Sequence, residues 1–303
     1  MKLANTTEDF GRVTGFDYKN SIRNTHEAGF QYIDLSMYIV QQSDPLFYAD
    51  NWQQYAYSLR DLGEQLGIQY VQAHSPSGNP YLSTEQYDIY LYKTIRSIKV
   101  CGILGIPNVV VHMGQRPGLG KEEFQKTSCS FVQKLIPSME KYGVNVLCEN
   151  GQKSEDYYCL CSGSEMREFI EYVNHPLFHG CWDTGHANLN GSQYDDIVTL
   201  GTDLYALHIN DNRGTLDEHM IPFFGTINMD EVMTALLVSG YKGYFTFEAT
   251  YSLRPADVYF GPRRKFEKET RLYAPTLEMQ KDITVFMYKM GKHILNAYNC
   301  YEE

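Results

Sequence analysis

The feature that most constrains the fold is an alternation, repeated eight times, of a short apolar run with a longer amphipathic segment. The runs expected to be strands are KLANT, QYIDLS, IQYVQAH, PNVVVHM, VNVLCEN, HGCWDTG, LYALHIN and YFTFEAT. The remaining segments predict helices at 17–29, 50–66, 82–104, 120–142, 163–174, 192–200, 228–239 and 276–298. Apolar strands that alternate with helices are typical of a parallel sheet covered by helices.

The number of these units and the length of the chain together select one α/β architecture. Eight strand–helix units in 303 residues predict a (β/α)8 TIM barrel rather than an open sheet with a second domain. Neither a Pro/Ser-rich linker nor a charge block interrupts the alternation. We therefore expect one barrel domain over residues 1–303, with a long loop at about 250–274 and a C-terminal helix at about 276–298.

The charge balance points to a small polar partner. The formal net charge is -11, with 37 acidic and 26 basic residues, so nucleic acid and anionic membrane surfaces are unexpected partners. The chain has neither an apolar leader nor a run of about 18 apolar residues, and its seven cysteines are odd in number. We expect a cytoplasmic protein with reduced thiols, in which the spacing of Cys159 and Cys161 is a loop coincidence rather than a metal site. A homo-oligomer is compatible with the composition.

The last residues of the predicted strands carry the chemistry. In a (β/α)8 barrel the active site lies at the carboxyl ends of the strands. Six consecutive strands end in a carboxylate or an imidazole, namely His74, His112, Glu149, Asp183 with His186 just beyond it, His208 and Glu248. One such residue alone is more often a loop anchor. Converging carboxylates, however, repel and raise one another's pKa unless a cation lies between them, so the set predicts a metal.

The expected primary ligands are Glu149, Asp183, His208 and Glu248. Three carboxylates and one imidazole suit manganese or zinc, and magnesium is also allowed. Asp217 and His219 lie two residues apart in the polar loop after LYALHIN and form a candidate second cluster. The other histidines are expected to be structural or solvated.

Taken together, these segments resemble a known family along essentially the whole chain. VVVHMG, VLCENG, WDTGHANLNG, LHINDNRGTLDEH, FGTINMDEV and FTFEAT occur in an order similar to that of sugar phosphate isomerase/epimerase proteins. Those proteins belong to the xylose isomerase-like barrel superfamily, which also includes endonuclease IV. One departure is FFGTIN, which stands where a PGxGxI type of turn is usual.

The resemblance implies specific roles. It implies that Glu149, Asp183, His208 and Glu248 bind one divalent metal and that Glu149 and Glu248 also act on substrate. It makes His186 a catalytic, substrate-contacting or ligand-supporting residue. The endonuclease branch implies instead up to three zinc ions and cleavage of abasic DNA, with nine ligands that correspond here to His74, His112, Glu149, Asp183, His186, His208, Asp217, His219 and Glu248.

The leading hypothesis is a metal-dependent isomerase or epimerase of a ketose or sugar phosphate that works through an enediolate. The metal polarises the carbonyl, and Glu149 and Glu248 act as base and acid on opposite faces of the intermediate. Asn210, Asp211 and Arg213 are candidates for contacts to substrate, Arg213 to a phosphate. The alternatives are the endonuclease, a sugar or cyclitol dehydratase, and a non-catalytic sugar-binding barrel.

Overall fold

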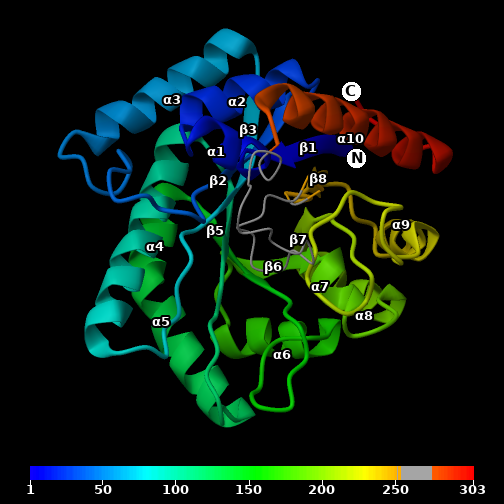
Figure 1. The fold of residues 1–303 in the computed structure, drawn as a ribbon. Coiled ribbons are helices and arrows are strands. Elements are labelled where there is room, and N and C mark those ends of the chain that lie inside the picture. The colour runs from blue at the N-terminus through cyan, green and yellow to red at the C-terminus, as the bar shows by residue number, and fades with distance from the viewer. Residues whose placement is uncertain (251, 254–274) are drawn as a thin grey trace, which may run out of the picture.

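The computed structural model describes residues 1–250, 252–253 and 275–303, and within them all eight predicted runs are strands (Figure 1). The strands are β1 (Lys2–Thr6), β2 (Tyr32–Ser36), β3 (Gln69–His74), β4 (Asn108–Val111), β5 (Asn145–Glu149), β6 (Phe178–Asp183), β7 (Leu204–His208) and β8 (Tyr244–Phe247). They are parallel and follow the order β7-β6-β5-β4-β3-β2-β1-β8. A parallel bridge between Ile209 and Phe247 joins the two ends of the sheet. The predicted TIM barrel is therefore confirmed.

Helices surround the strands. They are α1 (Glu8–Thr14), α2 (Tyr18–Glu27), α3 (Trp52–Leu66), α4 (Thr84–Leu104), α5 (Lys121–Tyr142), α6 (Gly163–Val173), α7 (Thr184–Asn188), α8 (Tyr194–Leu200), α9 (Met229–Val238) and α10 (Leu277–Ala297). A 3-10 turn, η1 (Gly201–Asp203), leads into β7. The sequence missed α1 and α7 because each is too short to show a helical period. The predicted loop at about 250–274 lies almost wholly outside the described residues.

Local signals explain where several helices begin and end. Ser162 caps α6 in a capping box with Glu165, and Asp17 caps α2 by accepting a hydrogen bond from the Asn20 amide. Gly67 and Gly143 end α3 and α5 with positive φ, as a left-handed C-cap requires. These caps fix the points at which the chain turns back toward the next strand.

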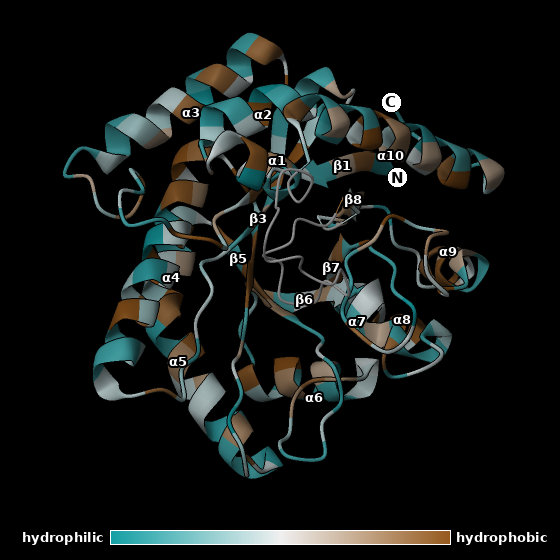
Figure 2. Ribbon diagram, in the orientation of Figure 1, coloured by the Kyte–Doolittle hydropathy of each residue, from teal (hydrophilic) through white to brown (hydrophobic). Residues whose placement is uncertain are grey.

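The main core lies between the strands and the helices, where large apolar side chains such as Phe30, Phe169 and Phe247 are fully buried. The outer helices accordingly carry both hydrophobic and hydrophilic residues (Figure 2). α10 packs beside β1, and the two ends of the chain meet where the Glu302 amide donates to the Met1 carbonyl oxygen at 2.9 Å. None of the described helices combines the length and apolarity needed to cross a membrane.

Inside the barrel, one small group of side chains from β4 to β7 is apolar, whereas a group from β2, β3 and β8 is polar. Val110, Leu147, Cys181 and Ala206 form a small apolar cluster separate from the main core. A fully buried polar layer also lies inside the barrel, in which Gln72 donates to Asp34 at 3.2 Å and Thr246 donates to Gln72 at 3.3 Å. Strand side chains therefore support the mouth of the barrel with hydrogen-bonded groups.

The close approach of α6 to α8 gives a test of this packing. A Cβ on Gly163 would lie 2.0 Å from the backbone oxygen of Asp196, so Gly163→Ala forces the two helices apart. We expect a loss of about 1–3 kcal/mol in the free energy of unfolding, measured by urea denaturation. Gly120→Ala is the control, since its Cβ meets nothing within 4 Å. An equal loss in both variants would contradict the packing described.

Candidate metal and substrate site

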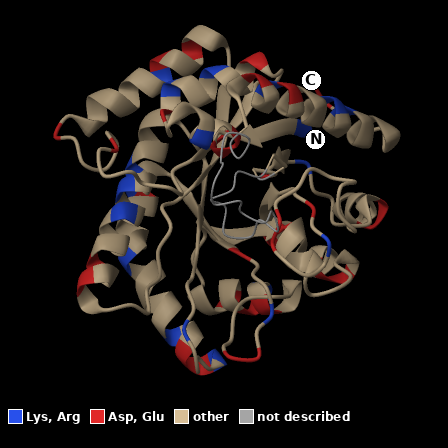
Figure 3. Ribbon diagram, in the orientation of Figure 1, with Lys and Arg blue, Asp and Glu red and all other residues tan. Residues whose placement is uncertain are grey.

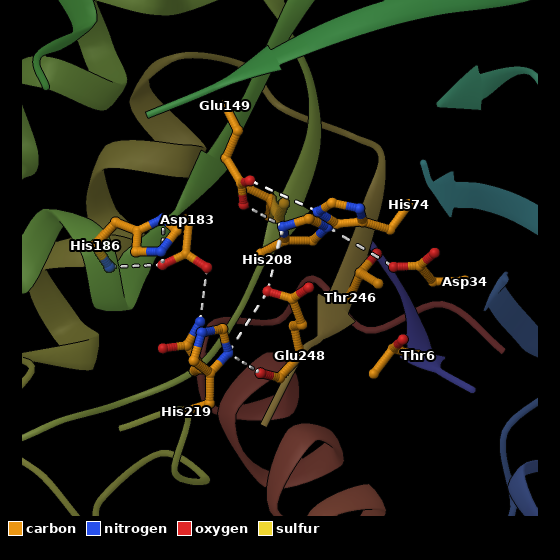
Figure 4. A network of polar contacts seen from close by, with 12 residues as sticks. Thr6, Asp34, His74, Glu149, Asp183, His186, His208, His219, Thr246 and Glu248 are labelled. Carbon is orange, nitrogen blue, oxygen red and sulfur yellow. Dashed lines mark hydrogen bonds and ion pairs between the residues drawn. The ribbon is translucent and has the colours of Figure 1, made fainter. Parts of the chain in front are cut away.

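The predicted strand-end residues converge at the mouth of the barrel. One potential ligand atom from each of Glu149, Asp183, His208 and Glu248 lies within 4.8 Å of those of the other three. The Nδ1 atom of His208 lies 2.5 Å from Oε1 of Glu149 and 3.4 Å from Oε2 of Glu248, which approach it from different sides (Figure 4). The four residues predicted as primary ligands are thus brought together.

The carboxylate of Asp183 is held by the start of α7. Its Oδ1 accepts a hydrogen bond from the His186 amide at 2.6 Å, and its Oδ2 accepts one from Nδ2 of Asn210 at 2.7 Å. Asn150 holds the backbone of Asp183 through two further hydrogen bonds. Asn210, a candidate for substrate contact, is fully buried, and its hydrogen bond orients the Asp183 carboxylate.

A second group consists of His186, Asp217 and His219. The Oδ2 atom of Asp217 lies 3.3 Å from Nε2 of His186 and 3.1 Å from Nε2 of His219. Nδ1 of His219 lies 2.8 Å from the Glu248 carbonyl oxygen and donates its proton to it, which leaves Nε2 facing Asp217. The Oδ1 atom of Asp217 is buried without a hydrogen-bond partner. The predicted second cluster therefore forms.

The loop after β7, which carries Asp217 and His219, is held by hydrogen bonds that involve the FFGTIN segment. The buried carboxylate of Asp211 accepts hydrogen bonds from the amides of Gly225 at 3.0 Å and Ile227 at 3.1 Å. A Cβ at position 225 would lie 2.2 Å from the Asn212 carbonyl oxygen, so the turn needs a glycine there. Asp211, expected as a candidate for substrate contact, instead ties the two ends of the loop together.

A third group shares Glu149 with the first. Nε2 of His112 lies 2.9 Å from Oε2 of Glu149, and Nε2 of His74 lies 3.8 Å from the same oxygen. A hydrogen bond from Nδ1 of His74 to the Ser75 carbonyl oxygen, at 2.8 Å, orients the imidazole ring. All nine residues of the predicted set therefore lie in three adjoining groups.

Arg213, a further candidate for substrate contact, does not line the cavities over the mouth. Its side chain is 60% exposed and lies 3.5 Å from Glu218, whose carboxylate also accepts from the Arg213 amide. The sequence predicted Arg213 near the mouth because the residue lies in the loop after β7. A loop position does not fix the direction of a long side chain.

A cavity of about 120 Å³ lies over these groups. Its lining adds Glu8, Tyr38 and Thr250 to the predicted residues, and a neighbouring cavity continues past Tyr38, His112, His186 and Asp217 to Cys159. Glu8 and Tyr38 follow the ends of β1 and β2 by two residues. The strand-end reasoning would have found both had it been carried to the first two strands.

The charges of the site are balanced by protons on its histidines. Burial alone would raise the pKa of Glu149, but His208, His112 and His74 hold the pKa of that carboxyl well below its usual range. Burial lowers the pKa of an imidazole, yet the neighbouring carboxylates raise the pKa of His74, His186 and His208 overall. Asp217 likewise raises the pKa of His219 to about 10 against its burial.

The pKa values of Glu248 and His112 depart from this pattern of neutralised carboxylates and protonated histidines. Burial raises the pKa of Glu248 to about 7, although His208 and His219 oppose the shift. Burial lowers the pKa of His112, so this imidazole is neutral. The donor set fits a divalent cation because a cation can take the place of the histidine protons and satisfy the unpartnered oxygen of Asp217.

The fully buried Asp34 lies beneath His208. Because Nδ1 of His208 faces the two glutamates, Nε2 points into the barrel, where it lies 3.7 Å from Oδ2 of Asp34. This distance is an electrostatic contact rather than a hydrogen bond. Nε2 of His208 and Oδ1 of Asp34 are both buried without hydrogen-bond partners. Asp34 was missed because it lies within β2 rather than at its end.

A family model for the xylose isomerase-like TIM barrel matches residues 22–274 of the chain. The chain belongs to this family. Among curated relatives, Probable endonuclease 4 of Cenarchaeum symbiosum is 27% identical in an alignment of 177 positions that covers 49% of this chain and 58% of the relative. The chain spans only 50 to 58% of the length of the first curated relatives that it matches.

Solved structures share the fold over nearly the whole chain. D-Psicose 3-epimerase with D-tagatose from Clostridium cellulolyticum H10 has a TM-score of 0.74 and 18% identity, covering 97% of this chain and 99% of the other. The IOLI protein with a bound zinc atom has a TM-score of 0.72 and 17% identity, covering 98% and 99%. At these sequence identities, the structural likeness shows only that the chains share the xylose isomerase-like barrel fold.

Metal affinity should rise with pH. Two of the expected ligands, His208 and Glu248, have raised pKa values and hold protons near neutrality, so a cation must displace these protons. We expect affinity for Mn²⁺ to increase about tenfold per pH unit for each proton displaced between about pH 6 and 8. Calorimetry in buffers of different ionisation enthalpy measures the protons released. An affinity that does not change over this range would contradict the charge balance.

Asp34 should strengthen metal binding through His208. Asp34→Asn keeps the shape of the side chain but removes the charge that faces Nε2, and we expect Mn²⁺ affinity to fall about tenfold. Asp44→Asn is the control, because this buried carboxylate accepts hydrogen bonds from Tyr18 and from the Leu46 amide rather than facing a candidate ligand. If the two variants bind Mn²⁺ equally well, Asp34 has no such role.

Proposed function

We propose that the protein is a divalent-metal-dependent isomerase or epimerase that acts on a ketose. The observation that carries the proposal is the pair of carboxylates, Glu149 from the end of β5 and Glu248 after β8, that meet at His208 on the floor of one cavity. Two carboxylates on different sides of a bound sugar can remove and return a carbon-bound proton. The likeness in fold to sugar 3-epimerases agrees with this reading.

The metal would be held by Glu149, Asp183, His208 and Glu248. When bound, a divalent cation supplies Lewis acidity for a carbonyl and its neighbouring hydroxyl. Manganese and zinc both suit this donor set, with magnesium also allowed. The zinc atom in the IOLI structure favours zinc by analogy of fold.

The side chains around the two glutamates orient them for proton transfer. His112 contacts Glu149 at 2.9 Å, and Nδ1 of His219 lies 3.6 Å from Oε2 of Glu248. In the proposed reaction one glutamate takes a proton from the carbon beside the carbonyl to give an enediolate. The other returns a proton from the opposite face to the same carbon, which yields an epimer, or to its neighbour, which yields an isomer.

The lining of the cavity favours a neutral sugar. Tyr38, His186 and Asp217 offer hydrogen-bonding groups to hydroxyls. Within the described residues, neither cavity over the mouth is lined by a lysine or an arginine that could hold a phosphate. Basic side chains lie instead on the outside, several of them on α4 (Figure 3). A run of basic residues at 263–265 in the predicted long loop lies outside the described residues.

An endonuclease IV-like phosphodiesterase is the second candidate. The three adjoining groups favour it, because all nine residues of the three-zinc set are present with ligand atoms in reach of one another. Curated relatives named Probable endonuclease 4 point in the same direction. The net charge of -11 argues against it, since binding to a DNA backbone relies on cations.

Glu149→Gln should abolish proton transfer. We expect exchange of a ketose C–H proton for deuterium, followed by NMR over a panel of ketoses with added Mn²⁺ or Zn²⁺, to fall about 10²- to 10⁴-fold. Metal content and circular dichroism of the variant separate loss of the base from loss of metal or fold. Glu171→Gln on the exposed face of α6 is the control and should exchange normally. Retained exchange in Glu149→Gln would refute the role of Glu149.

Metal count separates the two candidate enzymes. One metal per chain with C–H exchange supports the isomerase or epimerase. Three zinc ions with cleavage of an abasic DNA duplex support the phosphodiesterase instead. A chain with neither metal nor exchange is a sugar-binding barrel.

A further inference from the structure

The segment between β5 and α6 carries two thiols that face each other. Sγ of Cys159 lies 2.7 Å from Sγ of Cys161, although the sequence spacing suggested only a coincidence within a loop. Both side chains are partly exposed, whereas Cys101, Cys129, Cys148 and Cys181 are buried. A disulfide has an S–S distance of about 2.05 Å, so the two sulfurs need to approach by only about 0.7 Å.

The backbone on either side of the two thiols is fixed. The Gly151 amide donates to the Leu160 carbonyl oxygen at 2.6 Å, between the two cysteines. The Cys161 amide donates to Glu165 at 2.9 Å, and Asn190 donates to the Cys161 carbonyl oxygen at 3.4 Å. The backbone that carries both sulfurs is therefore held by hydrogen bonds to three other segments.

The position of this pair places it at the substrate cavity. Cys159 lines the cavity that His112, His186 and Asp217 also line. Its Sγ donates to the Gln152 carbonyl oxygen at 3.1 Å, three residues after Glu149. A change at these sulfurs therefore alters the cavity wall next to the candidate ligands.

We propose that Cys159 and Cys161 form a redox-active dithiol that a hydroperoxide converts into an intramolecular disulfide. Cys159 is the attacking thiol and Cys161 the resolving one. The hydrogen bond from Cys161 lowers the pKa of the Cys159 thiol, while the same contact raises the pKa of Cys161, which supports this order. The buried Cys148 and Cys181 have pKa values raised by burial and do not compete.

The reaction balances in two steps. The Cys159 thiolate attacks a peroxide oxygen, the S–O bond forms, the O–O bond breaks, and the released alkoxide or hydroxide takes up a proton. The Cys161 sulfur then attacks the Cys159 sulfur, the S–S bond forms, and hydroxide leaves with the Cys161 proton as water. The two thiols together lose two electrons, and the peroxide is reduced by two.

Thiol labelling with hydrogen peroxide as the probe tests the proposal. The reduced protein, as purified and after treatment with a chelator, is exposed to peroxide, denatured and alkylated. We expect two of the seven cysteines to escape alkylation. The peptide with Cys159 and Cys161 should be lighter by two hydrogen atoms, and a reductant should restore both thiols.

Variants assign the two roles. In Cys161→Ser, Cys159 should accumulate as a sulfenic acid that dimedone traps, whereas in Cys159→Ser both that adduct and the two-thiol loss should disappear. Cys300→Ser is the control, because Cys300 is also partly exposed but bonds the Leu295 carbonyl oxygen in the last helical turn, and it should behave as the unchanged protein. Full alkylation of Cys159 and Cys161 after peroxide, or a disulfide that links two chains, would overturn the proposal.

Discussion

The contact between Glu149 and His208 is the interaction on which the rest of the site depends. Glu149 also contacts His112 and lies close to His74. His208 also faces Glu248 and Asp34. Both residues are almost fully buried, so neither could keep its charge alone. Because each charge is matched by an opposite one, the mouth of the barrel can hold several carboxylates that would otherwise repel one another.

The scaffold places these groups with little freedom. Parallel strands end at the same edge of a barrel, so a polar residue that ends each strand lies near its neighbours without any special loop. The Asp183 carboxylate is fixed further because it caps α7 and accepts from Asn210. The loop after β7 is the part that needs its own support, and Asp211 provides it through the amides of Gly225 and Ile227. Rigid strand ends therefore supply the first group, and a tied loop supplies the second.

The sequence predicted what periodicity and strand ends determine. All eight strands follow from apolar runs, and the nine ligand candidates follow from polar residues at or just after those runs. The sequence did not predict Asp34 as a site residue, because an inward-facing polar residue within a strand has no distinctive pattern. The sequence placed Arg213 at the mouth from its position in the loop after β7. That prediction failed because a loop position does not determine where a long side chain points. The closeness of Cys159 and Cys161 likewise depends on loop hydrogen bonds that have no periodic signal.

The proposed ligand set alone does not decide between the two candidate chemistries, so the lining of the cavity is what separates them. A cation held by the proposed ligands Glu149, Asp183, His208 and Glu248 would suit either a sugar carbonyl or a phosphodiester. Recognition of DNA needs cationic side chains along a backbone path. In the described part of the chain, the cavity over the mouth is lined instead by hydroxyl, imidazole and carboxylate groups. Such a lining matches the hydroxyls of a sugar, so it favours the isomerase or epimerase even though all nine candidate ligands are present.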